Sequence, residues 1–153
     1  MSARKLYVLF LGNLATSFWF IPWVSKILHS IRGVQFKDSK SVFLGRGVII
    51  DNRYPELISI GRDVWITARV TILTHSFTSN LQRNLFGYEE KVASVTIKDG
   101  VFIGVGSIIC PGVIISENSY IAAGSVVTKN VAPNSLYGGN PAVYIKKLDL
   151  LDL

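Results

Sequence analysis

A repeat of six residues constrains the fold of this chain more than any other feature of its sequence. From residue 97 to residue 132 the sequence divides into "IKDGVF", "IGVGSI", "ICPGVI", "ISENSY", "IAAGSV" and "VTKNVA". Each unit begins with Ile or Val, its fifth residue is Ser or Val, and Gly, Asp, Glu and Asn gather between them. The same register runs through "IGRDVW", "ITARVT" and "ILTHSF" (60–77), and weaker units cover residues 44–55.

A period of six is typical of a short strand followed by a turn, with the leading aliphatic side chain inward each time. Small fifth residues avoid crowding the interior, and turn-prone residues suit the corners. Three such units close one triangular coil, and stacked coils share a continuous aliphatic core. No run in the repeat region sustains the 3.6-residue period of a helix. The sequence therefore predicts an all-β fold, a parallel β-helix, in one domain of 153 residues.

The register stops after Phe77 and resumes at Ile97, and "TSNLQRNLFGYEEKVASVT" (78–96) contains no repeat. An excursion of this length from a regular stack usually carries function. His75 stands just before it, at a corner where a small residue would suffice. Three roles are open for this histidine: metal ligand, buried structural residue or general base.

Other features of the sequence help to choose among these three roles. His29 is the only other histidine and lies in a different segment, so neither an ordinary metal site nor a three-histidine site is expected. A buried structural histidine would need hydrogen-bond partners at that corner. An imidazole has an unperturbed pKa of about 6.5 and can take a hydroxyl proton at neutral pH. These considerations favour the general base.

The hexapeptides, "THSF" (74–77) and the ending "AAGSVVTKNVAPNSLYGGNPAVYIKK" (122–147) resemble the hexapeptide-repeat acyltransferases. More narrowly, they resemble sugar O-acetyltransferases of the maltose, galactoside and surface-polysaccharide types. The resemblance implies a left-handed β-helix, which general crossover rules would not predict. It also implies a homotrimer, with acetyl-coenzyme A (acetyl-CoA) between neighbouring subunits and His75 as the catalytic base.

The resemblance further implies a set of coenzyme A contacts: Gly104, Ala123, Thr128, Lys129, Asn140, Pro141 and Lys146. The lysines would lie near the phosphates, and the small residues would let the pantetheine arm approach. Each of these residues also has a structural explanation, as a repeat residue or a solvated corner. For the acceptor, Asp51 matches a family aspartate that contacts sugar hydroxyls. Asn52 would replace a family asparagine whose position falls near Phe43, a departure that argues against a maltose- or galactoside-like acceptor.

Residues 1–33 form a basic and apolar segment. Residues 6–24 are strongly apolar, but they carry no clear signal-peptide cleavage site, and polar residues dilute them as a membrane span. Apolar and basic residues then recur at helical spacing: Trp23, Lys26, Ile27, His29, Ile31 and Arg32. We expect a helix on a membrane surface, with its cations at the headgroups, or one packed on the domain or a neighbouring subunit. Nucleic acid is not expected, because RNA-module signatures are absent.

The sequence thus predicts a left-handed parallel β-helix (34–138) with an extended loop (78–96), a short N-terminal helical segment (1–33) and a C-terminal turn and tail (139–153). We expect an acetyl-CoA-dependent O-acetyltransferase that uses no metal and modifies a sugar hydroxyl in capsule, O-antigen or exopolysaccharide synthesis. It would act in the cytoplasm, at the inner face of the cell membrane if residues 1–33 bind there. An N-acyltransferase acting on an amino sugar and a non-catalytic β-helix scaffold stay open as alternatives.

Overall fold

The computed structural model describes residues 3–18 and 21–149 and shows three sheets arranged as the faces of a triangular prism. Face 1 consists of β1 (Gln35–Phe36), β4 (Ile58–Ile60), β9 (Val95–Ile97) and β12 (Ile114–Ile115). Face 2 consists of β2 (Phe43–Leu44), β5 (Trp65–Ile66), β10 (Phe102–Ile103), β13 (Tyr120–Ile121), β15 (Ser135–Gly139) and β16 (Ala142–Lys147). Face 3 consists of β3 (Ile49–Ile50), β6 (Thr71–Ile72), β11 (Ile108–Ile109) and β14 (Val126–Val127).

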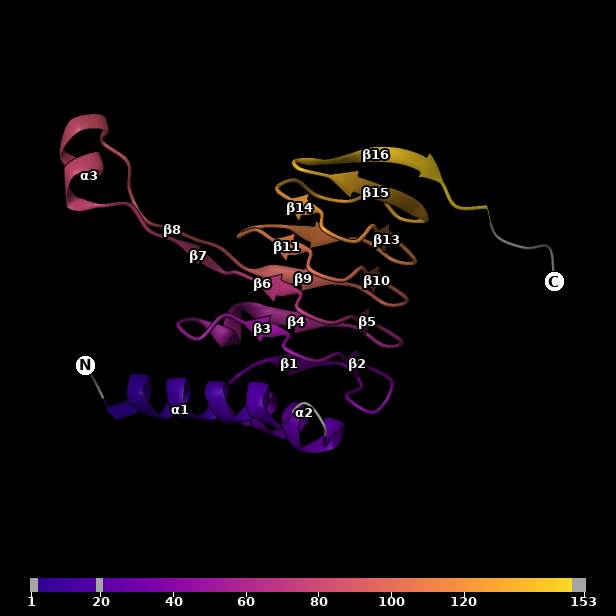
Figure 1. Cartoon of the computed structure of the whole chain (residues 1–153), viewed down its shortest axis with the longest axis horizontal. Coiled ribbons are helices and arrows are strands. Elements are labelled where there is room, and N and C mark those ends of the chain that lie inside the picture. The colour runs from indigo at the N-terminus through magenta and orange to yellow at the C-terminus, as the bar shows by residue number, and fades with distance from the viewer. Residues whose placement is uncertain (1–2, 19–20, 150–153) are drawn as a thin grey trace.

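The chain visits faces 1, 2 and 3 in turn, and each coil stacks on the one before it (Figure 1). Neighbouring strands of a face pair in parallel, for example β4 with β9 and β11 with β14. The exception is the antiparallel hairpin of β15 and β16, which ends the stack. The predicted parallel β-helix is therefore confirmed.

The leading aliphatic residues of the hexapeptides form the core, and none is more than 1% exposed: Ile60, Ile66, Ile72, Ile97, Ile103, Ile109, Ile115, Ile121 and Val127. The fifth residues of the units from 97 to 132 are buried beside them, and the hydroxyls of the serines among them bond to the backbone. Ser107 Oγ, for instance, donates to the carbonyl oxygens of Gly104 at 2.8 Å and Ala122 at 3.1 Å. These serines therefore close the corners and are structural residues, because their hydroxyls are satisfied by the backbone.

Two helices, α1 (Ala3–Ser17) and α2 (Pro22–Ile31), lie beneath the first coil at one end of the stack (Figure 1). The expectation that His29 and Arg32 are surface cations is wrong, because they are only 1% and 4% exposed. Both side chains lie inside, where Arg32 donates to backbone carbonyl oxygens of the first coil at the end of the stack. Among the described residues, no helix has the length and apolar character needed to cross a membrane.

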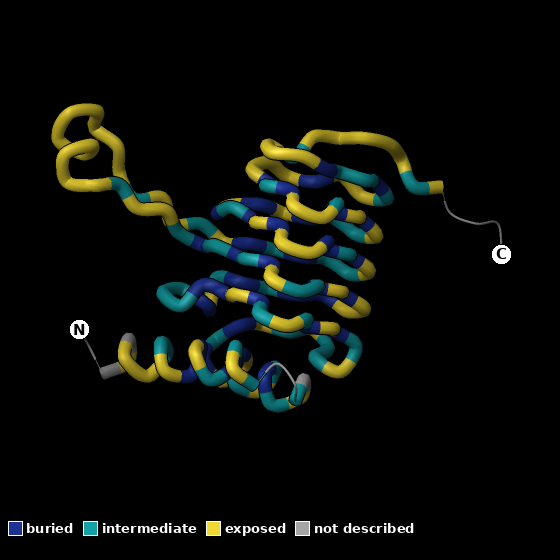
Figure 2. Tube along the Cα trace, viewed as in Figure 1, coloured by how far each residue is buried: buried dark blue, intermediate teal, exposed yellow. Residues whose placement is uncertain are grey.

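The predicted interruption is an arm that projects from the prism. It begins with an antiparallel pair, β7 (His75–Ser76) and β8 (Lys91–Val92), and carries α3 (Asn80–Phe86) at its tip. A capping box between Ser79 and Gln82 starts α3, and Gly87 ends it in the left-handed conformation. Figure 2 shows that the tip of the arm is exposed and that its stem is exposed or intermediate, and no residue of α3 is buried. A short 3₁₀ turn, η1 (Pro55–Leu57), precedes β4.

Candidate active site

His75 and Asp51 form a hydrogen-bonded pair at the edge of the prism where face 3 leads into face 1. Asp51 follows β3 in the first coil and His75 follows β6 in the second, so coil stacking brings the two together. The distance between His75 Nδ1 and Asp51 Oδ2 is 2.6 Å. The Asp51 side chain is 0% exposed and that of His75 is 17% exposed, so the carboxylate lies inside and the imidazole reaches the surface.

Hydrogen bonds hold both oxygens of the Asp51 carboxylate. The backbone N–H of Thr74 donates to Oδ2 at 2.8 Å, and that of Arg53 donates to Oδ1 at 2.7 Å. Burial alone would raise the pKa of Asp51, but these bonds and those from the Thr74 and His75 side chains outweigh it and lower the pKa below its ordinary value. Because a carboxylate only accepts, Nδ1 of His75 donates to it, and Nε2 keeps the lone pair that can take a proton.

Aromatic rings flank the His75 imidazole. The ring centroids of Phe77 and Tyr54 lie 4.6 Å and 5.8 Å from that of His75, both in edge-on contact. The Arg53 guanidinium lies 4.4 Å from the Phe77 centroid and 5.3 Å from that of Tyr54. Arg53 Nη1 also pairs with Glu90 Oε1 of the arm at 3.2 Å. These residues form a wall beside His75 and tie the base of the arm to the first coil.

A buried arginine supports the Asp51 loop from below. Arg32 donates to the carbonyl oxygens of Ile50 at 2.7 Å and Asp51 at 3.0 Å, and to Asn52 Oδ1 at 2.7 Å. Its Nε donates to His29 Nδ1 at 2.9 Å. Burial lowers the pKa of Arg32 to about 10, and burial together with the Arg32 charge lowers the pKa of His29 to about 3. At neutral pH the arginine is therefore charged and the histidine neutral.

The residues predicted for the acceptor have other partners in the structure. Asp51 is buried against His75 with both oxygens engaged, so its carboxylate orients the imidazole and does not face an open surface. The side-chain oxygen of Asn52 faces Arg32, and α1 packs so closely that a Cβ at Gly12 would collide with it. Asp51 is thus a positioning residue in this geometry, which differs from the expected contact with sugar hydroxyls.

The structure divides the predicted site residues between two edges of the prism. One group lies on the edge between faces 3 and 1: Asp51, Asn52, His75, Thr128 and Lys129. The other group lies on the edge between faces 2 and 3 or on the strands that end face 2: Gly104, Ala123, Asn140, Pro141 and Lys146. The width of face 3 separates the two edges. One chain therefore does not bring its own base beside the residues predicted for the pantetheine arm.

The residues predicted for coenzyme A differ in exposure. Six are at the surface, where a ligand can reach them: Ala123, Thr128, Lys129, Asn140, Pro141 and Lys146. Gly104 is buried, and a Cβ there would collide with the backbone of Ala122 and Ala123 in the next coil. Close stacking of the coils is thus a sufficient reason for this glycine. The surface positions suit the charged and extended parts of coenzyme A, and their contacts with it stay a prediction.

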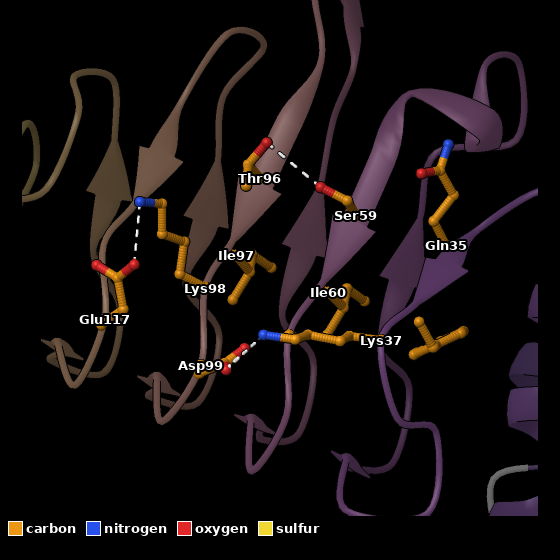
Figure 3. A pocket seen from close by; sticks show the side chains of 11 residues that line it. Gln35, Lys37, Ser59, Ile60, Thr96, Ile97, Lys98, Asp99 and Glu117 are labelled. Atoms are coloured by element: carbon orange, nitrogen blue, oxygen red, sulfur yellow. Dashed lines mark hydrogen bonds and ion pairs between the residues drawn. The ribbon is translucent and has the colours of Figure 1, made fainter.

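A shallow pocket on face 1 offers a second place to search for a site (Figure 3). Its charged side chains engage one another in the pairs Lys37–Asp99 at 2.8 Å and Lys98–Glu117 at 3.0 Å. No histidine or cysteine lines it. Nor do the described residues gather three His, Cys, Asp or Glu side chains in an arrangement that could hold a metal ion. The edge with His75 therefore carries the stronger chemistry.

Several contributors to this edge were not predicted from the sequence. Arg53 and Tyr54 follow Asp51 directly, and Phe77 ends the unit that contains His75, so the coil register could have placed all three near the histidine. Arg32 had no such signal, because a basic residue at the end of an apolar helix is usually solvated.

Comparison with known proteins agrees with this architecture. Residues 94–129 match the family model described as bacterial transferase hexapeptide (six repeats). The galactoside O-acetyltransferase of Escherichia coli K12 is 30% identical over 129 residues, which cover 83% of this chain and 61% of that protein. The chain spans about half the length of the curated relatives that it matches.

Two solved structures share the fold. A maltose O-acetyltransferase of Clostridium difficile 630 has a TM-score of 0.73 and 26% identity, over 96% of this chain and 87% of that one. A hexapeptide-repeat acetyltransferase of Vibrio cholerae O1 biovar eltor, solved with acetyl-CoA, has a TM-score of 0.67 over 97% of this chain and 91% of that one. At 22% identity the second likeness is one of fold. The β-helix is left-handed, as predicted, and the chain shares the hexapeptide repeat of bacterial transferases and resembles the sugar O-acetyltransferases.

Proposed function

We propose that the chain is an acetyl-CoA-dependent acyltransferase that acetylates a hydroxyl of a saccharide, with His75 as the general base. The observation that carries the proposal is the pair of Asp51 and His75, whose side chains meet at 2.6 Å on an edge of the prism beside the arm. A buried carboxylate bonded to one ring nitrogen selects the tautomer in which the other nitrogen can accept a proton. The named relatives support acetyl-CoA as the donor.

The reaction requires one proton transfer and one acyl transfer. His75 Nε2 takes the proton of the acceptor hydroxyl as the hydroxyl oxygen bonds to the carbonyl carbon of the acetyl thioester. The carbon–sulfur bond breaks, and the proton passes from Nε2 to the departing thiolate, which leaves an O-acetyl ester and a free thiol. Asp51 keeps its bond to Nδ1–H and stabilises the imidazolium. Backbone N–H groups of a neighbouring coil would stabilise the negative charge on the thioester oxygen.

The proposal includes a homotrimer with its active sites between subunits. His75 and the residues predicted for the pantetheine arm, Gly104 and Ala123, lie on different edges of one prism, so two subunits would complete each site. The arm exposes large apolar side chains, each at least 59% exposed, that a neighbouring subunit would cover: Leu81, Leu85, Phe86 and Tyr88.

The proposed acceptor is a sugar unit of a surface polysaccharide under synthesis in the cytoplasm. Tyr54 and Phe77 give the site apolar ring surfaces against which a sugar ring can pack. The names of the relatives, galactoside and maltose O-acetyltransferase, support a saccharide. The position near Phe43, where the sequence lacks the family asparagine, argues for an acceptor other than maltose or a galactoside.

Thiol release tests the proposal directly. Purified chain is incubated with acetyl-CoA and a panel of saccharides, including amino sugars, and free thiol is measured. We expect release with at least one hydroxyl acceptor and a loss of about 10²–10⁴-fold for His75→Ala. The control is Ser76→Ala, because Ser76 follows His75 in the chain and is exposed. Its rate of thiol release should stay within a few-fold of that of the parent.

Each other outcome has a distinct meaning. Thiol release with amino sugars alone would change the assignment to N-acyl transfer. No thiol release with any acceptor would favour a non-catalytic β-helix scaffold. A His75→Ala variant within a few-fold of the parent would show that His75 is not the base.

A further inference from the structure

We propose that α1 and α2 form a docking surface for an anionic lipid bilayer. The two helices, called the base layer below, cover the first coil at the end of the prism opposite the β15–β16 hairpin (Figure 1). The proposal stands apart from the catalytic role of His75, because it rests on the side chains of the helices alone.

Apart from Leu11, the side of the base layer that meets the prism is small or polar. In α1 the buried residues are Leu11, Gly12 and Ala15, and close approach to Asn52 leaves no room for a side chain at Gly12. In α2 and the residue that ends it, the buried residues are Ser25, His29 and Arg32. The hydrogen bonds of Arg32 to the first coil fix this side inward.

The opposite side of the base layer is apolar and exposed. Its large side chains are between 49% and 64% exposed: Leu6, Tyr7, Phe10, Trp23, Ile27 and Ile31. At helical spacing residues 23, 27 and 31 lie opposite residues 25, 29 and 32, so α2 turns its apolar side away from the protein. A helix on the surface of a soluble domain has the reverse arrangement. A group of exposed apolar residues of this size marks a contact site.

The charge of the segment selects an anionic lipid surface as the occupant. Residues 3–31, which span the two helices, contain three Lys and Arg residues and no Asp or Glu. Arg4 is exposed on α1, and Lys26 is half-buried on α2 with its Nζ bonded to the carbonyl oxygen of Val42 at 3.0 Å. Tyr7 and Trp23 are of the type that favours the membrane–water interface. An outward apolar side flanked by cations without acids is typical of a helix that lies in that interface.

Sedimentation with vesicles tests the proposal on the full chain. Vesicles of phosphatidylcholine with phosphatidylglycerol are compared with vesicles of phosphatidylcholine alone, and the pelleted protein is measured. We expect binding to the anionic vesicles that is about tenfold or more tighter than to the neutral ones and that weakens as salt is added. Ile27→Glu, in the middle of the apolar side, should weaken it about tenfold or more. Arg4→Glu should weaken binding to the anionic vesicles only.

The matched control is Val143→Glu, which adds the same charge at a position 60% exposed on β16, at the other end of the stack. It should bind vesicles as the parent does, and circular dichroism should show all three variants folded. The proposal fails if the parent does not sediment with anionic vesicles, or if Val143→Glu loses as much binding as Ile27→Glu. If the parent does not bind vesicles, the sedimentation coefficients of the parent and of Ile27→Glu are compared in solution. A smaller value for Ile27→Glu would identify the base layer as a contact between copies of the chain.

Discussion

Asp51 keeps its carboxylate inside the prism because hydrogen bonds replace the water that it loses there. Two come from the backbone of Thr74 and Arg53, and the third comes from the imidazole of His75. A buried carboxylate without such partners would take up a proton, and it would then no longer stabilise a charged imidazole. The bonds from Arg53 and Thr74 come from the first and second coils, so the pair depends on the register between the two coils.

Asp51→Asn should reduce acetyl transfer by about 10²–10⁴-fold, because an amide can donate to Nδ1 and so favours the wrong tautomer of His75. The control is Asp63→Asn, at an exposed corner whose left-handed backbone asparagine tolerates well. Both variants are assayed by thiol release and by thermal unfolding. Activity of Asp51→Asn near that of the parent would mean that Asp51 does not orient the base.

The sequence predicts His75 as a functional residue because it alone interrupts the corner pattern before the arm departs. The partner role of Asp51 is harder to predict. Its position after β3 follows from the register, but the direction of its side chain depends on N–H groups that only the folded coils bring to it. The same limit applies to Lys129 and Lys146, whose surface positions do not by themselves identify a ligand.

The junction between α2 and the first coil joins two elements that have different periods. The first coil has no coil beneath it, so its backbone needs another partner, as the end of any solenoid does. Arg32 supplies it by donating to the carbonyl oxygens of Ile50 and Asp51, with His29 as the acceptor for its Nε. The helix therefore turns its polar side inward, and its apolar side remains outside.

This junction predicts a loss of stability in mild acid. The pKa of His29 is lowered to about 3 in the fold, whereas an unfolded chain has the ordinary value of about 6.5. Below about pH 6.5 the His29 imidazole takes up a proton in the unfolded state but stays neutral in the folded state. The free energy of unfolding therefore decreases as the pH is lowered from about 6.5 toward 3. The slope can reach about 1.4 kcal/mol per pH unit.

His29→Gln keeps an acceptor for Arg32 but cannot be protonated, so it should flatten this dependence between about pH 6.5 and pH 5. Urea unfolding at several pH values measures the slope. Asp51 contributes little in that window, because an ordinary aspartate titrates at about pH 3.9 and the fold lowers its pKa further. Equal slopes in the parent and the variant would contradict the assignment of His29 as the titrating group.

The elements differ in how far the sequence predicts them. Each coil repeats the same local requirement, an inward aliphatic and a turn residue, so the register and the core follow from the pattern. In α2 the spacing of Trp23, Ile27 and Ile31 predicts an apolar side, but two opposite orientations satisfy that pattern equally. The carbonyl groups at the end of the first coil decide between them, and these become available only after the coil forms.

At the scale of the whole molecule, the arm contributes little to the stability of one chain. None of the residues in α3 is buried, and its contacts with the prism run through the β7–β8 pair and through Arg53 and Glu90. An element that keeps Leu81 and Leu85 about two-thirds exposed is suited to contact another copy.

Replacing Leu81 and Leu85 with Ser should therefore weaken association while each chain stays folded, with a loss of about 1.5–3 kcal/mol for each leucine that the interface buries. Sedimentation velocity measures the association, and circular dichroism checks the fold. Asn84→Ser, an exposed polar change on the same helix, is the control. Unchanged association and unchanged thiol release in the double variant would place the interface elsewhere.

The stack of coils also sets a height. His75 belongs to the second coil, and coils repeat about every 4.8 Å above a helix layer about 10 Å thick. With the base layer resting on a bilayer, the proton acceptor would stand roughly 15–20 Å from the headgroups. A sugar attached directly to a lipid phosphate would lie too low to reach it. The height of His75 would then set a minimum acceptor length, because a lipid-linked saccharide would reach the imidazole only after growing several units outward from its lipid.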